Sequence, residues 1–175
     1  MQLRKLLAYL REHDLVVATA ESCTAGLIAG RLADASGVGS ALQVGFVVYS
    51  PEAKCHCLGV SKTTIERFGL TSEEVAREMA LGALERSDAS IALADTGLAD
   101  APKGGSDIPA GTVCFAWAVR DDGEARLFSE TRRFDGSRNV VRRAAADHAL
   151  ERIPHYYERA GDPEQSPPER KNGRH

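Results

Sequence analysis

A serine and a lysine stand at two points of the chain where catalytic groups are expected. Ser22 lies between an apolar run, Leu15–Ala18, and a segment with helical spacing, Leu27–Ala33, which predicts a strand, a tight turn and a helix. Lys54 lies one turn into another predicted helix, directly after a strand. Serine is a weak nucleophile, and a neutral lysine within hydrogen-bond distance can accept its proton. The pair predicts nucleophilic catalysis, of which amide hydrolysis is one form.

The predicted elements place Ser22 where open α/β sheets bind ligands, at the carboxyl end of a strand that faces a helix N-terminus. Backbone N–H groups of Cys23, Thr24, Ala25 and Gly26 could there receive an anion or a developing oxyanion. The same local pattern also allows Ser22 to be no more than the N-cap of the helix. The local sequence leaves both interpretations open.

Lys54 follows a second predicted strand, Gln43–Tyr49, and a strong helix-start signal, with Ser50 at the N-cap and Pro51 at the first helical position. The positive end of the helix dipole favours the neutral form of a lysine at this place, and burial would have the same effect. Tyr49 is placed to relay a proton or to orient the lysine.

Two further groups are expected at the same rim of the sheet. A third predicted strand, Ser90–Ala94, leads into Asp95, Thr96 and Gly97. Arg138, at the start of the last predicted helix, is suited to bind a phosphate or a carboxylate.

The expected elements follow the order α-β-α-β-α-α-β-β-β-α. Strands joined by helical crossovers predict a parallel core, and two strands around residues 121–123 predict a hairpin near the C-terminus. Thr71 and Glu74 match a capping box at the start of a helix whose apolar face includes Met79. The fold class is therefore α/β, a single-domain open α/β/α sandwich whose mostly parallel sheet carries a C-terminal antiparallel hairpin. Residues 1–160 form the domain, and the Pro- and charge-rich residues 161–175 are predicted to be a disordered tail.

The composition argues against a nucleic-acid-binding or membrane-spanning protein. The 175 residues carry a net charge of −3, with 43% hydrophobic and 27% charged residues, which is typical of a soluble globular protein and gives no reason to expect nucleic-acid binding. No apolar stretch is long enough to cross a bilayer, and the amphipathic N-terminal segment is unlike a signal peptide. We expect a cytoplasmic protein without membrane partners, with its four cysteines reduced. The spacing of Cys55, His56 and Cys57 does not match a zinc site.

Five segments resemble the CinA C-terminal domain family: TAESCTAGLIAGRL, VGFVVYSPEAKCHCLGV, TSEEVAREMALGA, DTGLA and PAGTV, in this order. The resemblance covers about Leu3 to Ile153. In that family the characterised activity is nicotinamide mononucleotide amidase, the PncC enzyme of pyridine nucleotide salvage. The molybdopterin-binding-like domain of larger members is not seen, so the sequence resembles the stand-alone form.

The resemblance implies that Ser22 is the nucleophile and Lys54 its general base, supported by Tyr49. It implies substrate binding by a further group of residues: Cys23, Thr24, Gly26, Thr96, Gly97, Gly105 and Arg138, the last for the phosphate. It implies no metal and no organic cofactor, a small-molecule nucleotide as ligand, and a homodimer or larger homo-oligomer.

The sequence departs from the family pattern near the substrate. Ala25 replaces a glycine, Asp95 an aliphatic residue, and the loop after it is one residue longer, with a glycine lost to Asp100 or its neighbour. Two carboxylates near a phosphate would repel it, and Lys103 would offset part of this. Two alternatives therefore stay open: an amidase of the same mechanism with another substrate, and a catalytically silent nucleotide-binding homologue.

Overall fold

The computed structural model describes residues 3–100, 107–121 and 124–162. Twelve elements occur in these residues. They are α1 (Leu3–Glu12), β1 (Val17–Glu21), α2 (Leu27–Ala33), β2 (Leu42–Val47), α3 (Pro51–Leu58), α4 (Lys62–Phe68), α5 (Glu73–Glu85), β3 (Ile91–Gly97), β4 (Thr112–Asp121), β5 (Glu124–Arg133), α6 (Arg138–Glu151) and α7 (Ile153–Ala160).

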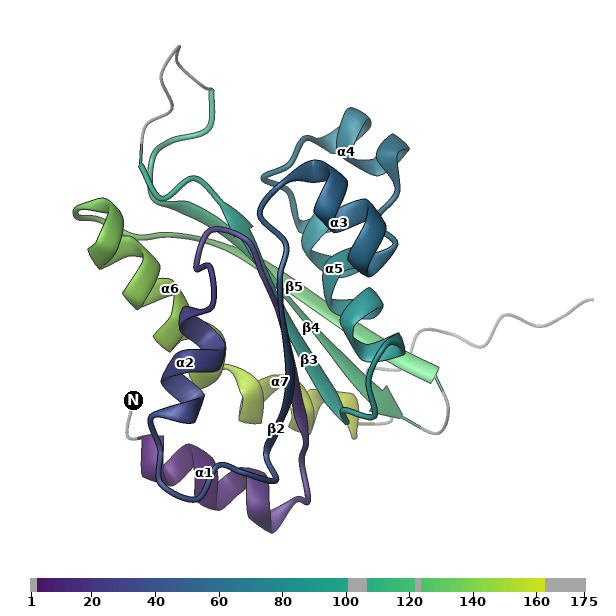
Figure 1. The fold of residues 1–175 in the computed structure, drawn as a ribbon, viewed down its shortest axis with the longest axis vertical. Coiled ribbons are helices and arrows are strands. Elements are labelled where there is room, and N and C mark those ends of the chain that lie inside the picture. Colours follow the sequence, from purple (N-terminus) through teal and green to yellow (C-terminus); the bar gives the residue numbers. More distant parts are fainter. Residues whose placement is uncertain (1–2, 101–106, 122–123, 163–175) are drawn as a thin grey trace, which may run out of the picture.

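The five strands form one mixed sheet in the order β2-β1-β3-β4-β5 (Figure 1). Strand β1 is parallel to both of its neighbours, β2 and β3, whereas β4 is antiparallel to β3 and to β5. This arrangement confirms the predicted α/β class, with a parallel core and a C-terminal antiparallel hairpin. The carboxyl ends of β1, β2 and β3 meet at one rim, as expected of parallel strands.

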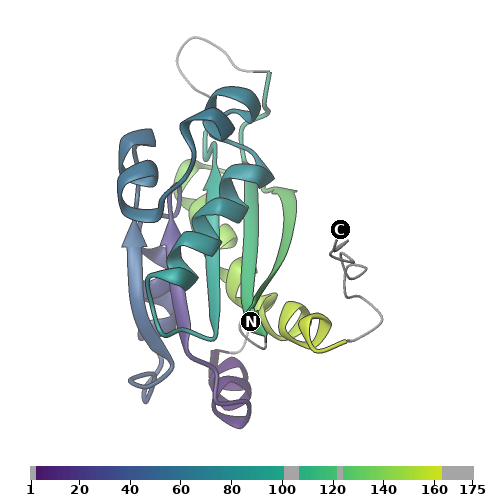
Figure 2. The same ribbon diagram turned by 90° about the vertical axis from the view of Figure 1, so that its right-hand side faces the viewer.

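Helices cover both faces of the sheet. Helices α3, α4 and α5 lie on one side, and α1, α2, α6 and α7 on the other (Figure 1), while Figure 2 shows α5 running along the sheet in front of the strands. The strand residues that face α5 are mostly alanines: Ala18, Ala20, Ala92, Ala94, Ala116 and Ala118. Small side chains let α5 pack close to the sheet, and Gly82 of α5 lies against the Leu58 carbonyl, where a Cβ would be 2.0 Å from the oxygen.

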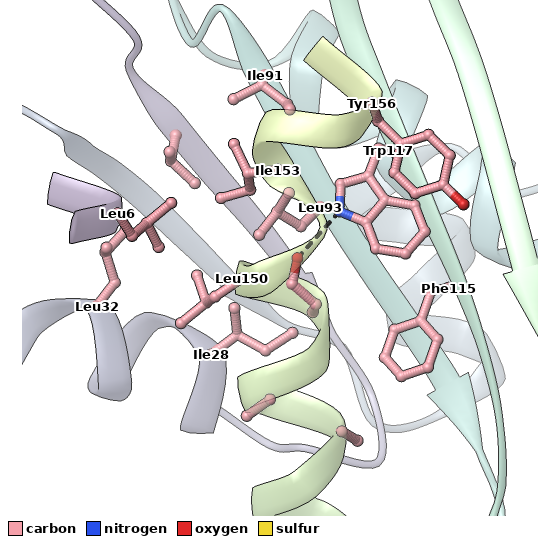
Figure 3. Packing of buried hydrophobic residues seen from close by; sticks show 14 of the residues in the cluster. Leu6, Ile28, Leu32, Ile91, Leu93, Phe115, Trp117, Leu150, Ile153 and Tyr156 are labelled. Carbon is pink, nitrogen blue, oxygen red and sulfur yellow. Dashed lines mark hydrogen bonds between the residues drawn. The ribbon is translucent and has the colours of Figure 1, made fainter. Parts of the chain in front are cut away.

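Large side chains fill the opposite face. Leu93, Phe115 and Trp117 are fully buried there, beneath α6 and α7. The Trp117 ring stacks on Tyr156 of α7, and its Nε1 donates to the carbonyl of Ala149 at 3.1 Å (Figure 3). The tryptophan thus ties the last two helices to the sheet and satisfies its own buried donor.

Some local predictions were wrong. Helices α4 and α7 were not expected, because α4 has no buried residue and α7 begins only two residues after α6, with Pro154 in its first turn. Ser72, not Thr71, is the N-cap of α5, since its Oγ accepts from the Val75 N–H. In the part of the chain that the structure describes, no helix is long and apolar enough to span a membrane. The predicted tail beyond Asp162 lies outside the described residues.

Candidate active site

Ser22 and Lys54 are in direct contact. Ser22 follows β1 immediately, and Lys54 lies in the first turns of α3, where Ser50 caps the helix by accepting from the Ala53 N–H at 3.1 Å. A helical side chain is tilted toward the helix N-terminus, so Lys54 reaches back to the sheet rim. Its Nζ lies 2.8 Å from Ser22 Oγ. Only 1% of Lys54 and 8% of Ser22 is exposed.

The surroundings of Lys54 suit a neutral amine. Its Nζ donates to the Val48 carbonyl at 2.9 Å and approaches the Tyr49 carbonyl at 3.5 Å. Burial lowers the pKa of Lys54 below its ordinary value. Two carbonyls can accept both N–H groups of a neutral lysine, which leaves its lone pair for the Ser22 hydroxyl proton. The geometry therefore matches a serine nucleophile beside its base.

The N-terminus of α2 is capped by Glu21 and not by Ser22. The Glu21 carboxylate accepts from the N–H groups of Ile28 at 3.0 Å and Ala29 at 2.9 Å. Gly26 occupies the N-cap position, with φ 92° and no side chain to supply a bond. Because a neighbouring carboxylate satisfies these N–H groups, Ser22 is free of the capping role that its position had allowed.

Thr24 and Asp95 point into the protein and away from the substrate side. Both are fully buried, and Asp95 Oδ1 accepts from the Thr24 N–H at 3.1 Å and from Cys23 Sγ at 3.0 Å. Thr24 Oγ1 lies 2.8 Å from Glu21 Oε2 and 2.5 Å from Asp95 Oδ2. The N–H and the hydroxyl of Thr24 are thus both engaged within the protein, and neither Thr24 nor Asp95 lines the cleft described below.

A cleft of about 240 Å³ opens over Ser22 and Lys54. It is lined by Ser22, Cys23, Tyr49, Lys54, Leu70, Thr71, Thr96, Gly97, Leu98, Ala99, Asp100 and Arg138. The structure thus brings together most of the residues singled out from the sequence. Gly26 is not in the lining, and Gly105 lies outside the described residues.

Arg138 reaches the cleft from the start of α6. One guanidinium nitrogen donates to the Tyr49 hydroxyl at 2.8 Å, and another lies 3.5 Å from Asp100 Oδ2. Tyr49 is 58% exposed, and its hydrogen bond with Lys54 is made by its backbone carbonyl. The phenol therefore orients Arg138, and the contact of Tyr49 with the lysine is made by its backbone carbonyl.

The Thr96 hydroxyl is already engaged. It donates to the Leu70 carbonyl at 2.7 Å and is 2% exposed. This bond fixes the segment before α5 against the end of β3. Thr96 can shape the cleft wall, but its hydroxyl proton is used within the protein.

Two of the four N–H groups proposed for an oxyanion are occupied. Thr24 N–H donates to Asp95, and Ala25 N–H donates to the Ser22 carbonyl at 3.2 Å. Of the two residues that carry the remaining N–H groups, Cys23 lines the cleft and Gly26 does not. Burial raises the pKa of the Cys23 thiol, so this side chain stays protonated and does not compete as a nucleophile.

Arg142 also holds the turn and was missed in the sequence. Its Nε donates to the Cys23 carbonyl at 2.9 Å, and a terminal nitrogen donates to the Thr24 carbonyl at 2.7 Å. A spacing of four residues puts Arg142 on the same face of α6 as Arg138, which was the available signal. No group of three metal-ligating side chains occurs among the described residues.

Comparison with known proteins gives concordant matches. A family model described as the CinA C-terminal domain matches residues 2–157. A CinA-like protein of Chlorobium limicola is 44% identical over 142 residues, which are 81% of this chain and 33% of that protein. The chain thus spans about a third of the length of such relatives. A protein of Enterobacter agglomerans named nicotinamide-nucleotide amidohydrolase PncC is 42% identical over 82% of this chain and 86% of its own length.

Solved structures show the same fold. The crystal structure of competence/damage inducible protein CihA from Agrobacterium tumefaciens superposes with a TM-score of 0.82 at 36% identity, covering 89% of this chain and 93% of that one. A competence-damaged protein (CinA) superfamily protein from Escherichia coli gives a TM-score of 0.80 at 37% identity, over 88% and 87% of the two chains.

Proposed function

The chain belongs to the CinA C-terminal domain family, and we propose that it is an amidohydrolase that converts nicotinamide mononucleotide to nicotinic acid mononucleotide and ammonia. The observation that carries the proposal is the 2.8 Å contact between Ser22 Oγ and the buried Nζ of Lys54, at the base of a cleft that Arg138 also lines. The proposed substrate is taken from the name of the PncC relative.

In the first half-reaction, Ser22 Oγ attacks the carboxamide carbon while its proton passes to Lys54 Nζ. The carbonyl oxygen becomes an oxyanion, which the Cys23 N–H is placed to stabilise; loss of one such donor typically costs about 2.7–4 kcal/mol. The C–N bond then breaks, and Lys54 returns the proton to the departing nitrogen. The products are ammonia and an ester between the pyridine carboxyl group and Ser22.

In the second half-reaction, water attacks the ester carbon and gives a proton to Lys54. The C–O bond to Ser22 breaks, the proton returns to Ser22 Oγ, and the acid is released. The same lysine acts as base and acid in both halves, which needs a pKa nearer neutrality than an exposed lysine has. Its burial supports this requirement.

The substrate proposal rests on charge as well as on the relative. Arg138 is a cation at the cleft rim, and a guanidinium binds phosphate oxygens in a bidentate manner. Tyr49 holds this guanidinium at 2.8 Å. A nucleotide whose carboxamide lies over Ser22 would have its phosphate available to Arg138.

The ion pair between Arg138 and Asp100 favours a second candidate, an amidase of the same mechanism that acts on an amide without a phosphate. Asp100 Oδ2 lies 3.5 Å from the guanidinium and occupies part of the place a phosphate would take. A phosphorylated substrate must displace this carboxylate, whereas an uncharged one need not.

Ammonia release tests both candidates. Purified protein is incubated with nicotinamide mononucleotide and, separately, with nicotinamide riboside, and the acid product is identified by chromatography. We expect the mononucleotide to be the better substrate and Ser22→Ala to lower the rate at least about a thousandfold. The control is Ser61→Ala, an exposed N-cap without a side-chain bond. Preference for the riboside would support the second candidate, and ammonia from neither amide would refute both.

A further inference from the structure

Two buried carboxyl groups lie side by side beneath the Ser22 turn. Glu21 of β1 and Asp95 of β3 are register partners on neighbouring parallel strands, so both side chains project from the same face of the sheet. Neither has exposed surface. Two carboxylates in such a position repel one another strongly, and one of them is expected to keep its proton.

The hydrogen bonds show that the pair holds a proton. Thr24 Oγ1 lies 2.8 Å from Glu21 Oε2 and 2.5 Å from Asp95 Oδ2. A threonine hydroxyl carries one hydrogen and can fill only one of these contacts as donor. The other contact must be filled by a hydrogen on a carboxyl oxygen.

The remaining donors indicate which carboxyl is protonated. Glu21 already accepts from Ile28 N–H on Oε2 and from Ala29 N–H and the Thr19 hydroxyl on Oε1, all within 3.0 Å. An ionised carboxylate suits this set of donors at a helix N-terminus. Asp95 Oδ1 accepts from Thr24 N–H and Cys23 Sγ, whereas Thr24 Oγ1 alone contacts Oδ2 in the described residues. Oδ2 is therefore the site for the hydrogen.

The geometry points to Asp95 as a neutral carboxylic acid in the folded protein, a positioning residue that donates from Oδ2 to Thr24 Oγ1 while Thr24 donates to the Glu21 carboxylate. This chain fixes the turn that carries Ser22 and leaves Lys54 without a carboxylate partner. Burial, together with the Glu21 charge, raises the pKa of Asp95 and agrees with the assignment.

The consequence for Lys54 rests on the proposed function. An ionised Asp95 would raise the pKa of Lys54 and hold the lysine in its protonated form, in which it cannot act as a base. A neutral acid has no such effect. A further charged group at the turn is Arg142 of α6, which donates to the Cys23 and Thr24 carbonyls and, being cationic, does not raise the pKa of Lys54.

Asparagine is the matched substitution. In Asp95→Asn the amide nitrogen can donate to Thr24 Oγ1 as the acid does, and the amide oxygen can accept from Thr24 N–H and Cys23 Sγ. The comparison variant is Glu21→Gln, which also removes one carboxylate charge from the pair. Urea unfolding of the parent and both variants is measured from about pH 5 to pH 8.

A carboxyl that is protonated when folded and ionised when unfolded makes folding less favourable as the pH rises. The folding equilibrium constant of Asp95→Asn relative to the parent should therefore rise about tenfold per pH unit until Asp95 ionises. The same ratio for Glu21→Gln should not vary. A constant ratio for Asp95→Asn overturns the proposal, and a rising ratio for Glu21→Gln alone would place the proton on the other carboxyl and also overturn it.

The pH profile of ammonia release gives a second test. If Asp95 is neutral, the acidic limb of the profile stays at the same pH in Asp95→Asn, because no charge near Lys54 has been removed. A limb that moves to lower pH by one unit or more would show that Asp95 is ionised and refute the proposal. If the parent releases no ammonia, the proposed function fails, while the unfolding data still decide the state of Asp95.

Discussion

Replacing Lys54 with methionine should separate catalysis from stability. Methionine has nearly the length of the lysine chain and fills the same buried space without a charge or a base. A general base contributes about a hundred- to ten-thousandfold to the rate, so Lys54→Met should lose at least about a hundredfold in ammonia release. Most buried polar groups cannot be removed without loss of stability. Here we expect the free energy of unfolding to be maintained.

The expected free energy of unfolding of Lys54→Met follows from the burial and the contacts of Lys54 Nζ. Burial lowers the pKa of Lys54 in the folded protein below its unfolded value, and each pH unit between the two values costs the fold about 1.4 kcal/mol at lower pH. Methionine removes this cost. It also leaves the Val48 and Tyr49 carbonyls and the Ser22 hydroxyl without a partner, at about 1 kcal/mol each. These two effects oppose one another, so the free energy of unfolding of the variant should stay close to that of the parent.

The stability difference between Lys54→Met and the parent should depend on pH in one direction. Because the pKa of Lys54 is lower in the folded than in the unfolded protein, the unfolded chain binds more protons between these two values, and parent stability rises with pH through this range. The stability of Lys54→Met relative to the parent should therefore fall as the pH rises toward the unfolded pKa of Lys54. Urea unfolding and ammonia release are measured together, with Lys62→Met, an exposed lysine, as the control. A variant that keeps its activity, or is destabilised equally at every pH, would refute this reasoning.

Three other substitutions test separate features of the structure. Ala25 has φ 51°, a conformation that costs an alanine about 1–2 kcal/mol. After the entropy of glycine is included, Ala25→Gly should raise the free energy of unfolding in urea by about 1 kcal/mol. No gain in stability would contradict the left-handed turn. A Cβ on Gly82 would lie 2.0 Å from the Leu58 carbonyl oxygen, so Gly82→Ala should destabilise the protein by about 1–3 kcal/mol. An unchanged midpoint of thermal unfolding would contradict the close packing of α5 on α3. Asp100→Asn frees Arg138 from a half-exposed ion pair and should lower KM for nicotinamide mononucleotide about two- to fivefold without changing kcat; an unchanged KM would argue against phosphate binding at Arg138.

The sequence was informative where the chemistry follows from local pattern. The apolar runs before Ser22 and Lys54, and the helix-start signal at Ser50, located both groups at the rim where parallel strands end. Parallel strands end at a common edge, so the proximity of the two groups could be inferred without coordinates. Their 2.8 Å separation and the burial of the lysine could not be inferred from the sequence, because both depend on the packing of α3 against the sheet.

The features of the site that the sequence did not reveal depend on contacts between residues that are distant in sequence. Asp95 lies near the end of β3, which borders the cleft, and only the register of β3 against β1 shows that its side chain lies beside Glu21. Glu21 caps α2 across seven to eight residues, beyond the range of local capping rules. The bond of Thr96 to the Leu70 carbonyl and the orientation of Tyr49 toward Arg138 likewise depend on where loops meet.

The most direct test of the account is a double-mutant cycle on Ser22 and Lys54. Rates of ammonia release from nicotinamide mononucleotide are measured for the parent, Ser22→Ala, Lys54→Met and the double variant. Residues that act as one unit give grossly non-additive losses, so the double variant should be no slower than the slower single variant. If the two losses multiply, or if Ser22→Ala retains the parent rate, Ser22 and Lys54 do not form a nucleophile and base pair.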